Sequence, residues 1–212
     1  MRMNPLGRSG LMVSELCLGT MTFGTQTPEQ ESHAQIDLAL EGGINFVDTA
    51  EMYPVNPVKA ETIGRTEEII GAWLGKNANR RGDMILATKH SGEGLQSVRN
   101  GAPISSQTIP EAIEGSLRRL QTDYIDLYQL HWPERKTNFF GKLGYEHDDS
   151  NEWTQFENIL EDLKKFQKEG KIRHIGLSNE TPWGLSKFLE LSKSKNLPRM
   201  LSVQNPYNLL NR

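Results

Sequence analysis

The sequence predicts an α/β fold, and more narrowly a (β/α)8 barrel of the TIM type in which about six βα units are present. Short β-branched or apolar runs alternate with amphipathic stretches, which is typical of repeated βαβ units around a parallel sheet. Residues suited to chemistry stand at the carboxyl ends of successive strands, and a closed barrel gathers such ends into one ring. An open dinucleotide-binding sheet would carry G-x-G-x-x-G after its first strand, but Gly19 and Gly24 do not have this spacing.

A β-hairpin is expected first, because residues 7–10 form a glycine-bounded turn between two short segments. Six strands are then predicted, over residues 16–20, 44–49, 84–89, 126–132, 172–179 and 201–207. Such a barrel usually has eight strands and roughly 250 residues, whereas this chain has 212. We therefore expect one partial barrel domain over residues 1–212, with the last two βα units missing. Two long polar loops, residues 53–66 and 133–151, are candidate substrate-side loops.

Five helices are predicted between the strands, and two of them begin with a pattern typical of a capping box. Thr27 precedes Pro28 and has Gln30 three residues later, so its hydroxyl is expected to cap the first helix. Thr108 and Glu111 have the same spacing and predict a second box.

The last two helices also have recognisable ends. Thr181 followed by Pro182 predicts the start of one helix, with the threonine as its cap. The preceding helix, expected over residues 154–170, carries its apolar residues on one side and stops at Gly170.

The composition excludes several classes of protein. The net charge of −3 argues against nucleic acid as a partner. No apolar run approaches the roughly 20 residues that a membrane span needs, and the first residues do not resemble a secretory signal. The single cysteine, Cys17, excludes a disulfide framework and fits a reducing cytoplasm, and the histidines lack metal-ligand spacing. We expect a cytoplasmic enzyme without a metal.

Four residues at or near the ends of three successive strands form a chemically sensible site for polarising a carbonyl group. Tyrosine has a pKa of about 10, too high for efficient proton donation at neutral pH. A positively charged Lys89 near Tyr53 would lower that pKa, while Asp48 could hold the lysine in place. His131 would donate a hydrogen bond to the substrate carbonyl. Each residue alone also fits a structural role, such as a loop cap or a packed ring. Their matching positions at the ends of successive strands favour a catalytic site.

Seven short motifs in order resemble those of the aldo-keto reductases. They are GINFVDTA (43–50), EEIIG (67–71), SLRRLQTDYIDL (116–127), HWP (131–133), GKIR (170–173), GLSN (176–179) and QNPYN (204–208). Any one of these motifs is weak evidence for the family, whereas seven in the right order are strong evidence. The resemblance extends from Leu6 to Arg212 and is to the branch that contains the bacterial Tas proteins and the potassium-channel β subunits. It implies a (β/α)8 barrel that uses a nicotinamide cofactor.

The resemblance assigns roles to individual residues. It implies that the catalytic tetrad, with the tyrosine as proton donor, consists of Asp48, Tyr53, Lys89 and His131. It also implies that the cofactor lies against Thr20, Met21 and Asp48, and that its carboxamide is held by Ser178, Asn179 and Gln204. Asparagine and glutamine side chains offer the donors and acceptors that a carboxamide needs. Trp132 is a candidate wall of the substrate pocket, with plain packing as the alternative.

The predicted function is reduction of an aldehyde or ketone by hydride transfer from NADPH, with Tyr53 as the proton donor and a small carbonyl compound as the substrate. A cofactor-sensing regulatory subunit is one alternative, because the resemblance includes channel subunits. An inactive fragment is another, because the family's seventh and eighth strands carry the contacts to the pyrophosphate and the adenosine phosphate. The natural substrate, the preference for NADP over NAD and the oligomeric state stay open.

Overall fold

Six parallel strands form one curved sheet in the structure, a computed structural model that describes residues 1–147 and 155–210. They are β3 (Cys17–Gly19), β4 (Phe46–Asp48), β5 (Ile85–His90), β6 (Ile125–Leu130), β7 (Ile172–Ser178) and β8 (Met200–Gln204). The strands are neighbours in chain order, and every pair is parallel. This arrangement is an incomplete barrel, so the predicted fold class and strand number are confirmed. The last strand ends at Gln204, earlier than predicted, and Pro206 has no N–H to extend the ladder.

The predicted N-terminal hairpin is also confirmed. It consists of β1 (Met3–Pro5) and β2 (Met12–Ser14), which pair antiparallel. Its tip contains Gly7, whose φ of +54° is a conformation that glycine adopts readily. A Cβ atom there would come within 3.0 Å of the Leu201 side chain, so the tip lies against the start of β8. The hairpin therefore lies at the amino end of the strands.

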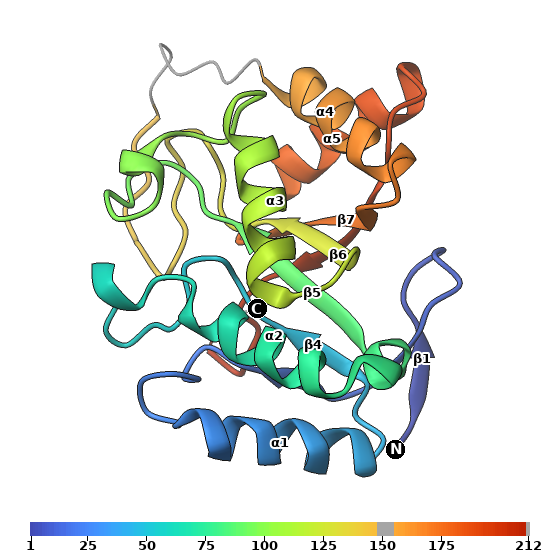
Figure 1. Ribbon diagram of the computed structural model, residues 1–212. Coiled ribbons are helices and arrows are strands. Elements are labelled where there is room, and N and C mark those ends of the chain that lie inside the picture. The colour runs from blue at the N-terminus through green and yellow to red at the C-terminus, as the bar shows by residue number, and fades with distance from the viewer. Residues whose placement is uncertain (148–154, 211–212) are drawn as a thin grey trace.

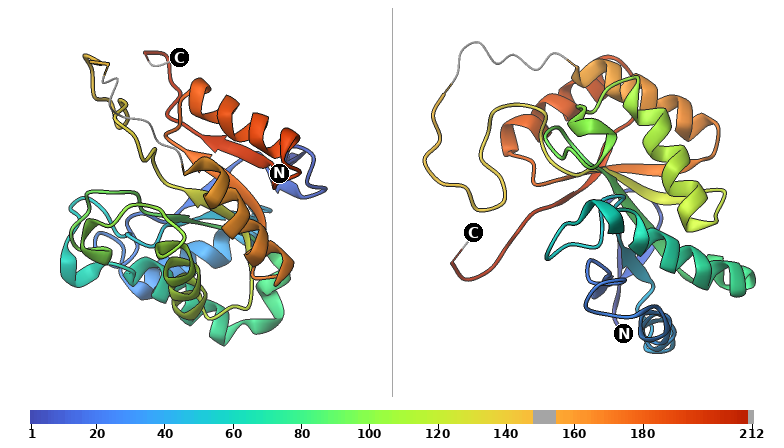
Figure 2. Two further views of the ribbon diagram at one scale, coloured as in Figure 1. Left: turned by 90° about the horizontal axis from the view of Figure 1, so that it is seen from above. Right: turned by 60° about the vertical axis from the view of Figure 1, so that its left-hand side comes forward.

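Five α-helices occur in the described residues and follow one another around one face of the sheet (Figures 1 and 2). They are α1 (Glu29–Glu41), α2 (Arg65–Lys76), α3 (Thr108–Leu120), α4 (Phe156–Lys168) and α5 (Pro182–Ser194). Three short 3-10 helices, Ala60–Thr62, Ala78–Asp83 and Arg99–Gly101, lie in the connections. None of the described helices is long and apolar enough to cross a membrane.

The two predicted capping boxes are wrong in detail. Pro28, rather than Thr27, occupies the position before α1, and no side chain caps that helix. In α3, Thr108 pairs with Ser105 instead of Glu111: Ser105 N donates to Thr108 Oγ1 at 2.9 Å, and Thr108 N donates to Ser105 Oγ at 3.3 Å. The reciprocal pair therefore forms three residues earlier than the sequence predicts, because the preceding turn already has a hydroxyl in the right place.

The other two helix ends agree with the sequence. Gly184 N donates to Thr181 Oγ1 at 3.2 Å, so Thr181 caps α5 as predicted. After α4, Gly170 adopts a φ of +77°, which ends the helix. The predicted first residue of that helix, at position 154, lies outside the described residues.

The hydrophobic core lies between the sheet and the helices that cover it. Its most buried side chains come from both layers and include Val47, Leu86, Ile125, Ile172 and Ile175 from strands and Ile36, Ile69, Ile113, Leu160 and Phe188 from helices. Parallel sheets are normally covered in this way, which explains why their strands are so apolar. The carboxyl ends of the strands are left free to carry polar side chains.

Candidate active site

Asp48 and Lys89 form a buried pair where β4 and β5 meet. Lys89 Nζ donates to Asp48 Oδ2 at 2.6 Å and to the carbonyl oxygen of Thr49 at 2.8 Å. Gln129 on β6 donates to the other carboxylate oxygen at 3.2 Å. The lysine side chain is almost fully buried, at 1% exposure. These bonds fix the ammonium group at the carboxyl end of the sheet, next to the segment that carries Tyr53.

Tyr53 lies close to the lysine and to His131. It follows β4 in a turn closed by Tyr53 N, which donates to the carbonyl oxygen of Ala50 at 3.0 Å. Lys89 Nζ lies 5.0 Å from the centre of the phenol ring, and the His131 ring meets that ring edge-on with a centroid separation of 5.8 Å. The structure therefore brings together the four residues that the sequence selected from three strands.

The pKa of Tyr53 reflects two opposing influences. Burial raises it, Lys89 lowers it by its charge and by a hydrogen bond, and Asp48 raises it again, so the net pKa lies above the usual value of 10. The expected effect of the lysine is present, but burial outweighs it. The expected net lowering of this pKa is therefore wrong, and the phenol stays protonated throughout the neutral range. Transfer of its proton then depends on Lys89, whose charge favours the phenolate that forms.

His131 stands at the end of β6 as a neutral imidazole. Burial, together with the charges of Lys89 and His90, holds its pKa well below 6.5. Its Nδ1 atom is buried and has no hydrogen-bond partner among the described residues. A neutral imidazole keeps one N–H for donation, so the ring can orient a carbonyl without adding a second positive charge beside the lysine.

The three residues expected to hold a carboxamide form a continuous edge beside His131. Asn179 Nδ2 donates to the backbone oxygen of His131 at 2.9 Å and to Ser178 Oγ at 3.1 Å. Asn179 N donates to the backbone oxygen of Gln204 at 3.0 Å, and Ser178 Oγ donates to the same oxygen at 3.2 Å. The ends of β7 and β8 are thus joined to the end of β6.

This edge has the chemistry that a nicotinamide carboxamide requires. The amide N–H groups of Asn179 are already used within the protein, so its Oδ1 is left to accept a hydrogen bond. Gln204 is exposed and provides both a donor and an acceptor. Of the other residues expected to contact the cofactor besides Asp48, Met21 is 38% exposed, whereas Thr20 is buried and donates its hydroxyl to Asp48 O at 2.8 Å. The side chains present therefore fit a nicotinamide carboxamide.

Aromatic rings cover one side of the cluster. Trp132 donates its indole N–H to Glu93 O at 3.3 Å, and its ring stacks on Phe139 at an angle of 15°. Phe140 meets Trp132 and His131 edge-on, with centroid separations of 5.7 and 6.4 Å. The sequence analysis missed both phenylalanines, although two adjacent aromatic residues inside a long polar loop were a detectable signal.

Glu134 is a half-buried carboxyl in the same loop. Its Oε1 accepts from Ile104 N at 2.8 Å and from Glu93 N at 3.1 Å, while its Oε2 is buried without a partner in the described part of the chain. Burial raises its pKa to about 7, against the smaller opposing effect of the two backbone donors.

We expect Glu134→Gln to change how stability depends on pH. The pKa of the folded carboxyl lies above its unfolded value of 4.5, so the native state binds the proton more tightly between pH 4.5 and 7. As the pH rises from 4.5 to 7, the free energy of unfolding of the wild type should therefore fall relative to that of the variant, by at most about 3 kcal/mol. Urea unfolding of both proteins at pH 4.5, 6 and 7.5 measures the difference. Parallel pH profiles would contradict the raised pKa.

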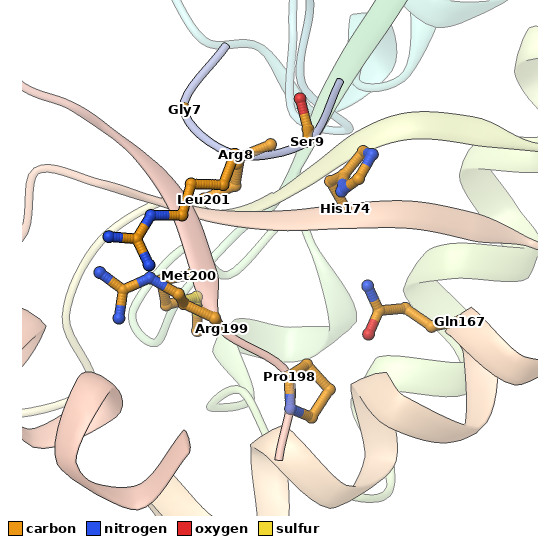
Figure 3. Close-up of a pocket in the computed structure, with 9 residues that line it drawn as sticks. All are labelled: Gly7, Arg8, Ser9, Gln167, His174, Pro198, Arg199, Met200 and Leu201. Carbon is orange, nitrogen blue, oxygen red and sulfur yellow. The ribbon is translucent and has the colours of Figure 1, made fainter. Parts of the chain in front are cut away.

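A separate pocket of about 440 Å³ lies at the opposite end of the strands (Figure 3). The hairpin tip, α4, β7 and the start of β8 line it, and Arg8 and Arg199 point to the same side of it. None of the predicted site residues lines this pocket.

The fold and the cluster define a class of protein: an α/β barrel with an aspartate, a tyrosine, a lysine and a histidine at its strand ends. The chain belongs to the aldo/keto reductase family, whose sequence model matches residues 15–212. The family resemblance seen in the seven motifs is thereby confirmed.

Individual relatives agree with this assignment. The chain is 48% identical to Protein tas of Escherichia coli K12, over 100% of this chain and 62% of that protein. It is 37% identical to a probable voltage-gated potassium channel subunit beta of rice, over 65% of this chain and 39% of that one. The holo form of the aldo-keto reductase AKR11C1 from Bacillus halodurans superposes with a TM-score of 0.72 at 33% identity, over 98% of this chain and 58% of that one. The chain thus spans about three-fifths of the length of its full-coverage relatives.

Proposed function

We propose that the protein is an oxidoreductase that reduces an aldehyde or ketone with NADPH, with Tyr53 as the proton donor. The observation that carries the proposal is the cluster at the strand ends, where a protonated phenol lies beside a buried ammonium group and a neutral imidazole. The family, the fold and the carboxamide-like edge at β7 and β8 support it. NADPH as the cofactor and reduction as the direction are taken from the family resemblance, and the experiment below compares NADPH with NADH.

Each side chain has a distinct part in this proposal. The bound cofactor supplies the hydride, and the protein supplies orientation and acid catalysis. His131 donates a hydrogen bond that orients the substrate carbonyl, and Tyr53 gives its proton to the carbonyl oxygen as negative charge develops there. Lys89 stabilises the phenolate that results, and Asp48 keeps the ammonium in position.

The remaining residues bind the two reactants. Ser178, Asn179 and Gln204 would hold the carboxamide of the cofactor, and Met21 would contact the cofactor as well. The ring of Trp132 forms one wall of the substrate pocket and excludes water from the reacting carbonyl.

Two measurements on this chain test the proposal. Quenching of NADPH fluorescence reports cofactor binding, and loss of absorbance at the NADPH band upon adding benzaldehyde or a ketone reports turnover. AKR11C1 serves as the assay control, and NADH is compared in parallel. Binding with aldehyde-dependent turnover supports the reductase. Binding without turnover favours a cofactor-sensing regulatory subunit. The absence of both binding and turnover would contradict both of these functions and would favour the inactive fragment.

We expect Gln204→Ala to weaken cofactor binding by about 2- to 10-fold, because one hydrogen bond contributes about 0.5–1.5 kcal/mol. The side chain is exposed, so the free energy of unfolding should hardly change. Fluorescence titration with NADPH measures the affinity. Gln35→Ala, which removes a glutamine on the surface of α1, is the matched control. Equal affinities of Gln204→Ala and Gln35→Ala would contradict the assignment of Gln204 to the carboxamide.

A further inference from the structure

Glu51 and Arg99 form a buried, doubly bonded ion pair close to the tetrad. Arg99 Nη1 donates to Glu51 Oε2 and Arg99 Nη2 donates to Glu51 Oε1, both at 2.6 Å. The Glu51 residue is 3% exposed. Bidentate pairs of this kind are strong and fix the geometry of both partners. Neither residue was selected from the sequence.

The carboxylate of Glu51 joins two segments that carry tetrad residues. Glu51 lies in the turn that ends at Tyr53, and its backbone N donates to the carbonyl oxygen of Lys89 at 3.3 Å. Its Oε1 accepts from Ser91 N at 2.6 Å, just after the end of β5. The side chain therefore holds the turn before Tyr53 against the strand end that carries Lys89.

Arg99 extends the same connection into the loop of residues 91–107. Its φ is +45° and that of Asn100 is +54°, a left-handed backbone that residues with a Cβ atom seldom adopt. Such conformations persist where surrounding contacts impose them, and they cluster at functional sites. The same loop supplies Glu93 O, which accepts the indole N–H of Trp132.

The pair is charged at neutral pH. Burial alone would raise the pKa of Glu51, but the hydrogen bonds and charge of Arg99, with the charge of His90 and the N–H of Ser91, hold it below the usual value. Arginine does not lose its proton in proteins.

We propose that the Glu51–Arg99 pair is a positioning clamp that sets the distance between Tyr53 and Lys89 and holds the loop of residues 91–107 against Trp132. The two residues act through their neighbours and do not themselves touch the reacting atoms. The structural part of the proposal stands on the geometry alone, whereas its catalytic consequence rests on the proposed reductase function.

Hydrogen exchange tests the structural part without any activity. In Arg99→Met, the Ser91 amide should exchange at least 10-fold faster, and the NMR resonance of the Trp132 indole N–H should shift. Arg119→Met is the matched control, because it breaks another buried pair, Arg119 Nη2 to Glu67 Oε2 at 2.7 Å, outside the site. The control should leave both signals unchanged once exchange is corrected for global stability. Equal effects of the two variants would overturn the clamp.

Glu51→Gln keeps the proposal testable if Arg99→Met does not fold. This variant removes the charge but retains an oxygen for Ser91 N, so we expect a smaller acceleration of exchange in the same loop. Wild-type exchange rates in a folded Glu51→Gln variant would overturn the clamp as well.

Kinetics test the catalytic part. Arg99→Met should lower kcat at least 10-fold with the Kd for NADPH within twofold of wild type, and Arg99→Lys should restore part of kcat because it restores the charge. An unchanged kcat in an Arg99→Met variant whose loop of residues 91–107 exchanges faster would overturn the positioning role. A wild-type protein that shows the expected exchange behaviour but no turnover would instead contradict the reductase function and leave the structural clamp standing.

Discussion

Tyr53→Phe is expected to lower the rate of carbonyl reduction by about 10²–10⁴-fold, which is the usual contribution of general acid catalysis. The phenol hydroxyl acts on the carbonyl oxygen in the transition state, so the affinity for NADPH should stay within twofold. The ring itself is kept, and with it the edge-on contact to His131. Single-turnover kinetics with a saturating aldehyde, together with fluorescence titration of NADPH, measure the two quantities separately.

Tyr124→Phe is a suitable control for that experiment. Tyr124 lies between the guanidinium groups of Arg81 and Arg173, whose Cζ atoms are 3.9 and 3.8 Å from the centre of its ring. Its hydroxyl has no place in the proposed chemistry, so its loss should leave the rate unchanged. A Tyr53→Phe variant that keeps more than half of the wild-type rate in a step limited by chemistry would refute the proton-donor assignment.

Lys89→Met is expected to lower the rate of alcohol oxidation at least 10-fold and to lower the rate of carbonyl reduction by a smaller factor. The positive charge of Lys89 favours the phenolate of Tyr53, so its removal raises the pKa of that phenol further above 10. Oxidation needs the phenolate as a base, and each unit of pKa lowers its population tenfold. Reduction needs the protonated phenol, so its alkaline limb should move to higher pH. Rates in both directions between pH 6 and 10 measure the shift.

The fold of the variant must be checked, because Lys89→Met leaves the buried carboxylate of Asp48 without its ammonium partner. Breaking a buried pair typically costs about 3–5 kcal/mol of stability. Circular dichroism and urea unfolding establish that enough native protein remains, and Lys171→Met, at a partly exposed lysine paired with Glu114, is the control. A folded Lys89→Met variant with the pH profile of the wild type in both directions would contradict the coupling between Lys89 and Tyr53.

The order of the elements could be predicted because it depends on local patterns. A strand buried on both faces needs a continuous apolar run, as in residues 125–130, and a covering helix needs an apolar stripe, as in residues 156–168. The hairpin turn and the cap at Thr181 are local as well. The caps at Thr27 and Thr108 were predicted wrongly because neighbouring residues take their places: Pro28, not Thr27, stands directly before α1, and Ser105, not Glu111, pairs with Thr108.

The candidate site could be selected from the sequence because parallel strands place their carboxyl ends at one edge. Asp48, Lys89 and His131 each stand at the end of a strand, so strand assignment alone brings them together. The aromatic rings of Phe139 and Phe140 come from a loop whose path follows from no local pattern. Only the folded chain shows that they lie against Trp132.

The sequence by itself determined the parallel α/β architecture, the family and the residues at the strand ends, since repeating apolar patterns and short motifs encode them directly. The tertiary structure decided the balance of burial against charge that leaves Tyr53 protonated, and the pairing of Glu51 with Arg99 across 48 positions of the chain. Desolvation and long-range pairing depend on which segments come together in space. A linear pattern does not carry that information, because the same glutamate or tyrosine in an exposed loop would have neither the partner nor the shifted pKa.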